Sequence, residues 1–166
     1  MSSPDRILVA GIGNIFLGDD AFGVEVVREL TRSELPKGVD VVDFGIRGYD
    51  LAYAMMDGYA ATILVDATSR ANSPGTLYLI ELDPEELVKP EVEAQDGHSL
   101  GPLEVLRLVK SLGGDIARLY LVGCEPRVLE SEDGQIGLSE PVQAAIPQAI
   151  EMIRTLVRDL RVTTPT

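Results

Sequence analysis

Residues 7–23 read ILVAGIGNIFLGDDAFG, an apolar run that passes through a glycine-rich turn to two adjacent carboxylates, Asp19 and Asp20. The continuous apolar residues predict a buried strand, and the spacing of apolar residues over 21–32 predicts a helix after the turn. In open parallel α/β sheets, ligands bind in the crevice at the carboxyl ends of the strands. The sequence therefore places Asp19 and Asp20 where a functional site is expected.

The same stretch has an alternative interpretation as a dinucleotide-binding turn, because Gly11-Ile12-Gly13 follows the strand and precedes the helix. That motif needs a third glycine, and position 16 is Phe. Two aspartates beside a helix N-terminus would also repel a pyrophosphate. In a purely structural interpretation the glycines allow unusual backbone angles and one aspartate caps the helix, which accounts for one carboxylate and not for both.

Strand and helix patterns alternate along the chain, which predicts a three-layer α/β/α sandwich with a mainly parallel, five-stranded sheet and helices on both faces. Their apolar character predicts interior strands, at residues 7–11, 39–44, 62–65, 76–81 and 119–122. Helices are expected at residues 21–32, 50–56, 100–112 and 141–160. Polar stretches predict surface loops at residues 69–75 and 83–97, and the second is long enough to favour a functional role. We expect one domain over residues 1–166, with a frayed tail at 162–166.

Composition restricts the class of partner. The chain has 27 Asp and Glu against 14 Lys and Arg, so its net charge of -13 should repel nucleic acid and anionic membranes. A protein or a cation is the expected partner. The single cysteine, Cys124, excludes a disulfide within the chain and is compatible with a reducing compartment. Because the N-terminus lacks a signal-peptide pattern and no apolar run reaches membrane-spanning length, we expect a cytoplasmic protein.

Three side chains are predicted to converge at the carboxyl edge of the sheet. Asp20 follows the first strand, Asp66 follows the apolar run at 62–65, and His98, the only histidine, opens a helix after the long acidic loop. Two carboxylates and one imidazole can bind a divalent metal and leave coordination positions open. The alternative is that both aspartates cap local turns and that the histidine is an ordinary surface residue.

The second predicted strand ends in Asp43-Phe44-Gly45-Ile46-Arg47-Gly48, which adds a carboxylate and two flexible glycines to the same rim. Asp43 is as compatible with a structural role as with a functional one. Arg47 could pair with Asp43 or bind a peptide carboxyl group, and the sequence leaves both possibilities open.

Cys124 follows the last predicted strand, so a cysteine protease that pairs it with His98 has to be considered. Glu125 beside it disfavours the thiolate that such a mechanism needs, and a buried strand-end thiol is the preferred interpretation. The sequence contains no HExxH helix, nucleophile-elbow serine or paired CxxC, so the usual zincin, α/β-hydrolase and redox mechanisms lack their signatures.

Together these segments resemble the maturation endopeptidases of nickel–iron (NiFe) hydrogenases. The resemblance covers nearly the whole chain and rests on the GxGN…GDD block, the segment at 43–48, Val65-Asp66-Ala67, His98 and the late Gly123-Cys124-Glu125-Pro126 segment. It implies a protease that removes a short C-terminal extension from the hydrogenase large-subunit precursor after nickel has been inserted. The competing function is a non-enzymatic metal- or nucleotide-binding module on the same architecture, because a fold does not fix a function.

The resemblance also implies the metal chemistry. Asp20, Asp66 and His98 fall on the family's nickel-contacting positions and are the candidate catalytic residues. Position 20 is Asp where many relatives carry Glu, and both side chains offer an oxygen ligand. Nickel would be carried by the substrate precursor, and other divalent ions would occupy the site in vitro.

Substrate recognition is implied for Asp43 and Gly45, which lie in the family's DGGT-like segment, and for Gly48, which follows it closely. Here that segment reads Asp43-Phe44-Gly45-Ile46, so Ile46 replaces the threonine hydroxyl. The resemblance leaves two catalytic routes open, polarisation of the carbonyl by the metal and activation of a water by a carboxylate.

Overall fold

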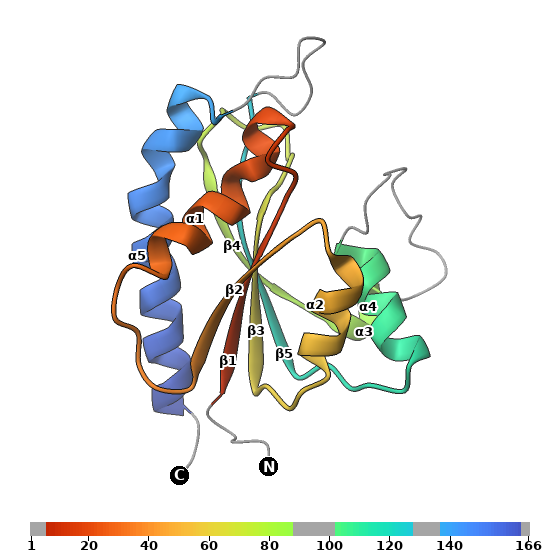
Figure 1. Ribbon diagram of the computed structural model, residues 1–166. Helices are drawn as coiled ribbons and strands as arrows, with labels where there is room; N and C mark the ends of the chain where they lie inside the picture. The colour runs from red at the N-terminus through yellow and green to blue at the C-terminus, as the bar shows by residue number, and fades with distance from the viewer. Residues whose placement is uncertain (1–5, 88–101, 128–136, 164–166) are drawn as a thin grey trace.

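A computed structural model describes residues 6–87, 102–127 and 137–163. They form a three-layer α/β/α sandwich around a five-stranded sheet (Figure 1). The strands are β1 (Ile7–Ile12), β2 (Val39–Gly45), β3 (Ala61–Ala67), β4 (Leu77–Leu82) and β5 (Arg118–Cys124), in the spatial order β2-β1-β3-β5-β4. Only β4 runs antiparallel to its neighbour, so the prediction of a mainly parallel five-stranded sheet is confirmed.

The prediction that all five strands are interior is wrong for β2 and β4, which form the two edges of the sheet. All six residues of β1 are buried, whereas the side chains of β4 alternate between partly buried and exposed positions. Leu79 and Glu81 both face outward on this edge strand. The apolar residues of an edge strand resemble those of an interior strand in sequence, although only one face of β4 is covered.

Helices cover both faces of the sheet. A short 3-10 helix, η1 (Gly18–Ala21), leads into α1 (Phe22–Leu30), which lies with α5 (Glu140–Thr163) on one face. The helices α2 (Gly48–Met55), α3 (Pro84–Leu87) and α4 (Pro102–Ser111) lie on the other face (Figure 1). Successive strand residues point to opposite faces, so Ile7 and Val9 enter the core under α1 and α5, and Leu8 and Ala10 enter the core under α2 and α4.

The ends of several predicted elements differ from the structure. The final helix continues to Thr163 instead of ending at Leu160, and residues 164–166 of the expected tail lie outside the described residues. The expected loop at 83–97 contains α3 near its start, and residues 88–97 lie outside the described residues. The expected surface loop at 69–75 is confirmed, with residues 69–74 exposed. None of the described helices combines the length and the apolarity needed to cross a bilayer.

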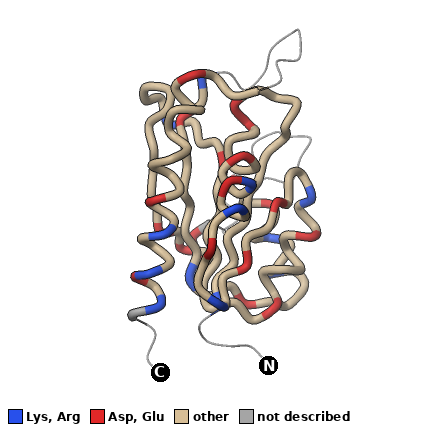
Figure 2. Tube along the Cα trace, turned by 60° about the vertical axis from the view of Figure 1, so that its left-hand side comes forward, with Lys and Arg blue, Asp and Glu red and all other residues tan. Residues whose placement is uncertain are grey.

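The parallel strands all point their carboxyl ends to the edge of the sheet that is uppermost in Figure 1. Figure 2 shows Asp and Glu along the whole height of the molecule. The predicted site therefore lies at the upper edge of an acidic molecule.

Candidate functional site

The structure brings two of the predicted site residues together, Asp20 of η1 and Asp66 near the end of β3. Burial raises the pKa of Asp66 well above its usual value, and the negative charge of Asp20 raises it further. Burial also raises the pKa of Asp20, while the hydrogen bond from the Asn14 backbone opposes that shift. The edge of the sheet therefore holds two interacting carboxyl groups, and the pKa of each is raised.

Close backbone packing explains why these two carboxyl groups meet. A Cβ on Gly23 would overlap the carbonyl oxygens of Val65 and Ile12, so only glycine lets α1 begin directly on the ends of β3 and β1. Gly13 has a φ of +145°, and a Cβ there would overlap the carbonyl oxygen of Asp20. The glycine-rich turn thus holds η1, with Asp20, against the end of β3.

Asp20 is held by the turn that precedes it. Its Oδ2 accepts a hydrogen bond from the Asn14 backbone N–H at 2.7 Å. The Asn14 side-chain oxygen in turn accepts from the Phe16 N–H at 2.9 Å. The residue at the N-cap of α1 is Ala21, and no side-chain cap is found there, so the alternative in which an aspartate caps this helix is wrong.

Asp19 has a different role from its neighbour. It is 1% exposed, and its carboxylate accepts hydrogen bonds from the Ser139 N–H at 2.6 Å, the Ser139 hydroxyl at 2.8 Å and the Arg127 N–H at 2.7 Å. These bonds join η1 to the segments that follow β5 and precede α5. The sequence marked both aspartates as candidates, and nothing in it pairs Asp19 with a residue 120 positions away.

His98 lies outside the described residues, so its place beside Asp20 and Asp66 stays a prediction. Within the described part of the chain, no group of three His, Cys, Asp or Glu side chains is placed to hold a metal ion. Asp20 and Asp66 can supply two oxygen ligands, and a further ligand has to come from elsewhere.

The segment at 43–48 forms one wall of the same edge. The Asp43 carboxylate lies 3.8 Å from Arg28 Nε, and the Gly45 carbonyl accepts a hydrogen bond from the Gly13 N–H at 3.0 Å. Gly48 is the first residue of α2. Arg47 donates to the backbone carbonyls of Asp43 and Phe44. Arg47 therefore stabilises its own turn. The sequence left open that it pairs with the Asp43 carboxylate, and that possibility is wrong.

The Cys124 thiol is buried, as predicted. Burial raises its pKa to about 11, and the carboxylates of Asp19 and Glu125 contribute to the shift. Glu125 has a structural role that the sequence did not reveal: one of its oxygens accepts hydrogen bonds from the Tyr78 hydroxyl at 2.6 Å and the Arg70 N–H at 2.8 Å. A thiolate nucleophile is therefore disfavoured at this position.

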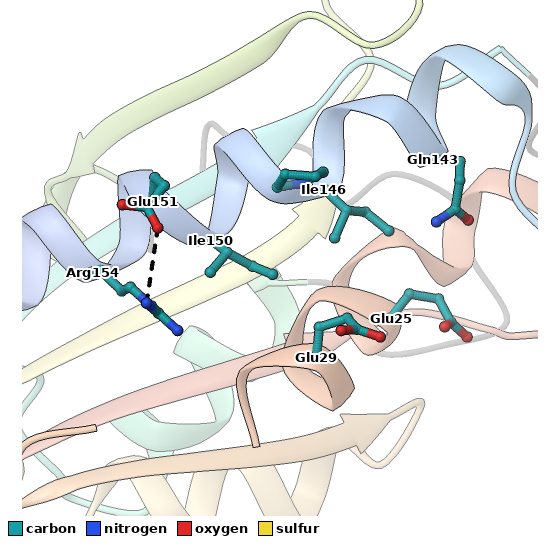
Figure 3. A pocket seen from close by; sticks show the side chains of 8 residues that line it. Glu25, Glu29, Gln143, Ile146, Ile150, Glu151 and Arg154 are labelled. Carbon is teal, nitrogen blue, oxygen red and sulfur yellow. Dashed lines mark ion pairs between the residues drawn. The ribbon is translucent and has the colours of Figure 1, made fainter. Parts of the chain in front are cut away.

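Two of the cavities lined by described residues lie beside α1. One of about 450 Å³ lies between α1 and α5, and among the described residues it is lined by none of the predicted site residues (Figure 3). The side chains drawn there come from both helices: Glu25, Glu29, Gln143, Ile146, Pro147, Ile150, Glu151 and Arg154. The second cavity, of about 210 Å³, lies between the turn after β1 and the turn after β2 and includes Asn14, Asp43 and Gly45. This smaller cavity adjoins Asp20 through Asn14.

Comparison with known proteins shows the same fold and sequence pattern. A family model described as hydrogenase maturation protease matches residues 24–156. The chain is 35% identical over 155 residues to the hydrogenase 2 maturation protease of Escherichia coli, which covers 93% of this chain and 92% of that protein.

Solved structures agree. The structure of the hydrogenase maturating endopeptidase HybD from E. coli has a TM-score of 0.78 and 34% identity, covering 93% of both chains. A hydrogenase 2 maturation peptidase from a Thaumarchaeota archaeon has a TM-score of 0.69 and 32% identity, covering 92% of this chain and 98% of that one. The similarity therefore extends over nearly the whole chain.

Proposed function

The chain belongs to the hydrogenase maturation protease family and is a hydrolase of peptide bonds, and we propose that it removes the C-terminal extension of a NiFe-hydrogenase large-subunit precursor after nickel insertion. We propose that precursor as the partner and the cytoplasm as the place of processing. We propose no role for nucleic acid or membrane. The alternative of a non-enzymatic binding module is disfavoured because the matching family model and the E. coli relative are both described as proteases.

The observation that carries the proposal is the pair of carboxyl groups at the carboxyl edge of the sheet. Asp20 and Asp66 interact there, and both have raised pKa values. Two oxygen ligands, with the imidazole of His98 as a proposed third, make an incomplete metal cage. Such a set suits an ion that another protein already holds, so we place the nickel on the precursor and assign its recognition to these residues.

The same carboxyl groups suit the chemistry of peptide hydrolysis. A carboxyl group with a raised pKa can take a proton from the attacking water and return it to the leaving amine. A divalent ion beside Asp20 and Asp66 would favour their ionised forms and could polarise the scissile carbonyl. Nickel occupancy would thereby align the scissile bond and set the protonation state of the base.

The proposal is tested with purified protein and two forms of the precursor, nickel-loaded and nickel-free, in a gel-shift processing assay. We expect cleavage of the loaded form alone. Asp20→Ala should abolish cleavage, whereas Asp115→Ala, which removes an exposed carboxylate beyond α4, should not change it. Equal cleavage of both precursor forms would overturn nickel recognition, and cleavage of neither form would overturn the proposed substrate.

A further inference from the structure

The edge of the sheet beside Asp20 exposes large apolar side chains. Of the three phenylalanines, Phe22 and Phe44 are buried, whereas Phe16 is 63% exposed. Ile46, on the opposite turn, is 58% exposed, and Ile15 is 37% exposed. Exposed apolar side chains that cluster beside a polar site mark a binding surface more often than scattered ones do.

These side chains surround a defined pocket. Phe16, Ile15 and Ile46 line the cavity of about 210 Å³, and the buried Val24 contributes to its apolar lining. The ion pair between Arg28 and Asp43 also lies in its lining, with 3.8 Å between Arg28 Nε and Asp43 Oδ2. A cavity of about 150 Å³ accommodates benzene, whereas sites for whole small ligands span about 300–1,000 Å³. The pocket therefore suits one large apolar side chain.

The walls of the pocket are held in place before any ligand arrives. The Phe16 N–H donates to the Asn14 side chain within the turn after β1. The Gly13 N–H donates to the Gly45 carbonyl and so joins this turn to the turn after β2. A preformed pocket loses little conformational entropy when it binds. The Asn14 N–H also donates to Asp20 Oδ2 at 2.7 Å. Asn14 therefore anchors both the pocket wall and Asp20, the candidate metal-binding residue.

We propose that this pocket binds an apolar side chain of the polypeptide substrate close to the scissile bond. The inference rests on the proposed function and adds Phe16, Ile46 and Ile15 as residues that determine specificity. A polypeptide is favoured over a small molecule because the apolar surface extends past the pocket. Tyr49 and Tyr53, one turn apart on α2, are 62% and 61% exposed.

The first test compares the Phe16→Ser, Ile46→Ser double variant with the wild type on the nickel-loaded precursor. We expect kcat/KM to fall by about 10- to 100-fold, chiefly through KM, because the variant loses apolar contacts with the substrate. The matched control is Leu112→Ser, which removes an exposed apolar side chain, 43% exposed, just beyond α4. Thermal unfolding should be nearly unchanged in all variants, since the replaced side chains are exposed.

The second test identifies the substrate side chain. Each apolar residue flanking the scissile bond of the precursor is replaced by Ser, one at a time, and each product is assayed with the wild type and with the double variant. We expect one substitution to lower kcat/KM strongly for the wild type and little further for the double variant. Methyl NMR of Ile15 and Ile46 with a synthetic peptide spanning the scissile bond gives a readout without cleavage.

The outcomes separate the two proposals. If the wild type cleaves the loaded precursor, an unchanged kcat/KM in the double variant, or independent effects of the enzyme and substrate substitutions, would overturn the pocket. Unperturbed Ile15 and Ile46 methyl signals at saturating peptide would overturn it as well. If the wild type cleaves no precursor, the proposed function fails, and the assignment of the pocket to that substrate fails with it.

Discussion

Asp19 has a structural role at this edge of the sheet, and its neighbour Asp20 belongs to the candidate site. Asp19 is buried and accepts three hydrogen bonds from Arg127 and Ser139, whereas Asp20 is partly exposed and interacts with Asp66. A sequence that places two carboxylates together identifies the region of the site. It does not say which carboxylate is structural, because that depends on contacts with distant residues.

We expect Asp19→Ala to lower the free energy of unfolding by roughly 2–4 kcal/mol, because it leaves buried backbone donors without an acceptor. Asp20→Ala should cost much less, since it removes one hydrogen bond and also relieves repulsion with Asp66. Urea unfolding of both variants checks the contrast. Equal losses of stability would show that the two aspartates do not differ in this way.

The raised pKa of Asp66 makes a prediction about pH. A carboxyl group whose pKa is higher in the folded protein than in the unfolded chain binds its proton more readily when folded, so it costs stability as pH rises above the unfolded value. The cost is absent below the ordinary pKa of 3.8 and complete above the raised folded pKa. We expect Asp66→Asn to become increasingly more stable than the wild type as pH rises from 4 to 8, by about 1.4 kcal/mol for each unit of pKa shift.

Chemical unfolding of both proteins across this pH range measures the difference directly. A constant difference between Asp66→Asn and the wild type would contradict the raised pKa. Because the two proteins differ only at position 66, the contributions of the other acidic groups to the pH dependence cancel to first order in this difference.

Cys124 should be dispensable. Its pKa of about 11 leaves almost no thiolate at neutral pH, and the side chain is buried. We expect Cys124→Ser to process the loaded precursor and the native thiol to resist iodoacetamide until the protein is unfolded. Loss of cleavage in a Cys124→Ser variant with a native circular dichroism spectrum would restore the nucleophilic interpretation.

At the scale of elements, the sequence predicted best those strands and helices that a local pattern of apolar residues specifies. The buried apolar runs of β1 and β3 and the apolar spacing of α1 were recognisable because a strand or helix covered on a known face leaves a regular pattern. The direction of β4 was not recognisable, since residues 76–81 would look alike in either orientation. The η1 turn and its bonds to Ser139 depend on tertiary contacts that no local pattern encodes.

The packing of α1 on the sheet supplies a prediction at this scale. Gly23→Ala would bring a Cβ into the carbonyls of Val65 and Ile12, so α1 must shift away from β3 and carry Asp20 with it. We expect lower stability and a lower kcat together. Gly113→Ala is the control: it meets nothing within 4 Å and introduces only the strain of a φ of +81°. Normal activity in a folded Gly23→Ala variant would show that the position of η1 is not critical.

For the molecule as a whole, the net charge of -13 creates a negative potential that extends around Asp20 and Asp66. Such a potential attracts a cationic metal centre or a basic segment, and it accelerates encounter more than chemistry. The screening length falls from about 10 Å at 0.1 M salt to about 3 Å at 1 M, so the attraction depends strongly on ionic strength.

We therefore expect kcat/KM for the nickel-loaded precursor to fall as salt is raised from 0.05 to 0.5 M, while kcat changes little. Steady-state processing rates at several salt concentrations measure both parameters. The charge pattern also predicts a substitution that alters this slope. Glu29→Gln on α1 should flatten the slope without changing kcat, because Glu29 pairs with Arg32 and lines neither the Asp20 site nor the apolar pocket. A salt-independent kcat/KM would mean that docking is governed by apolar contacts alone, which would leave the Phe16 and Ile46 pocket as the principal determinant of binding.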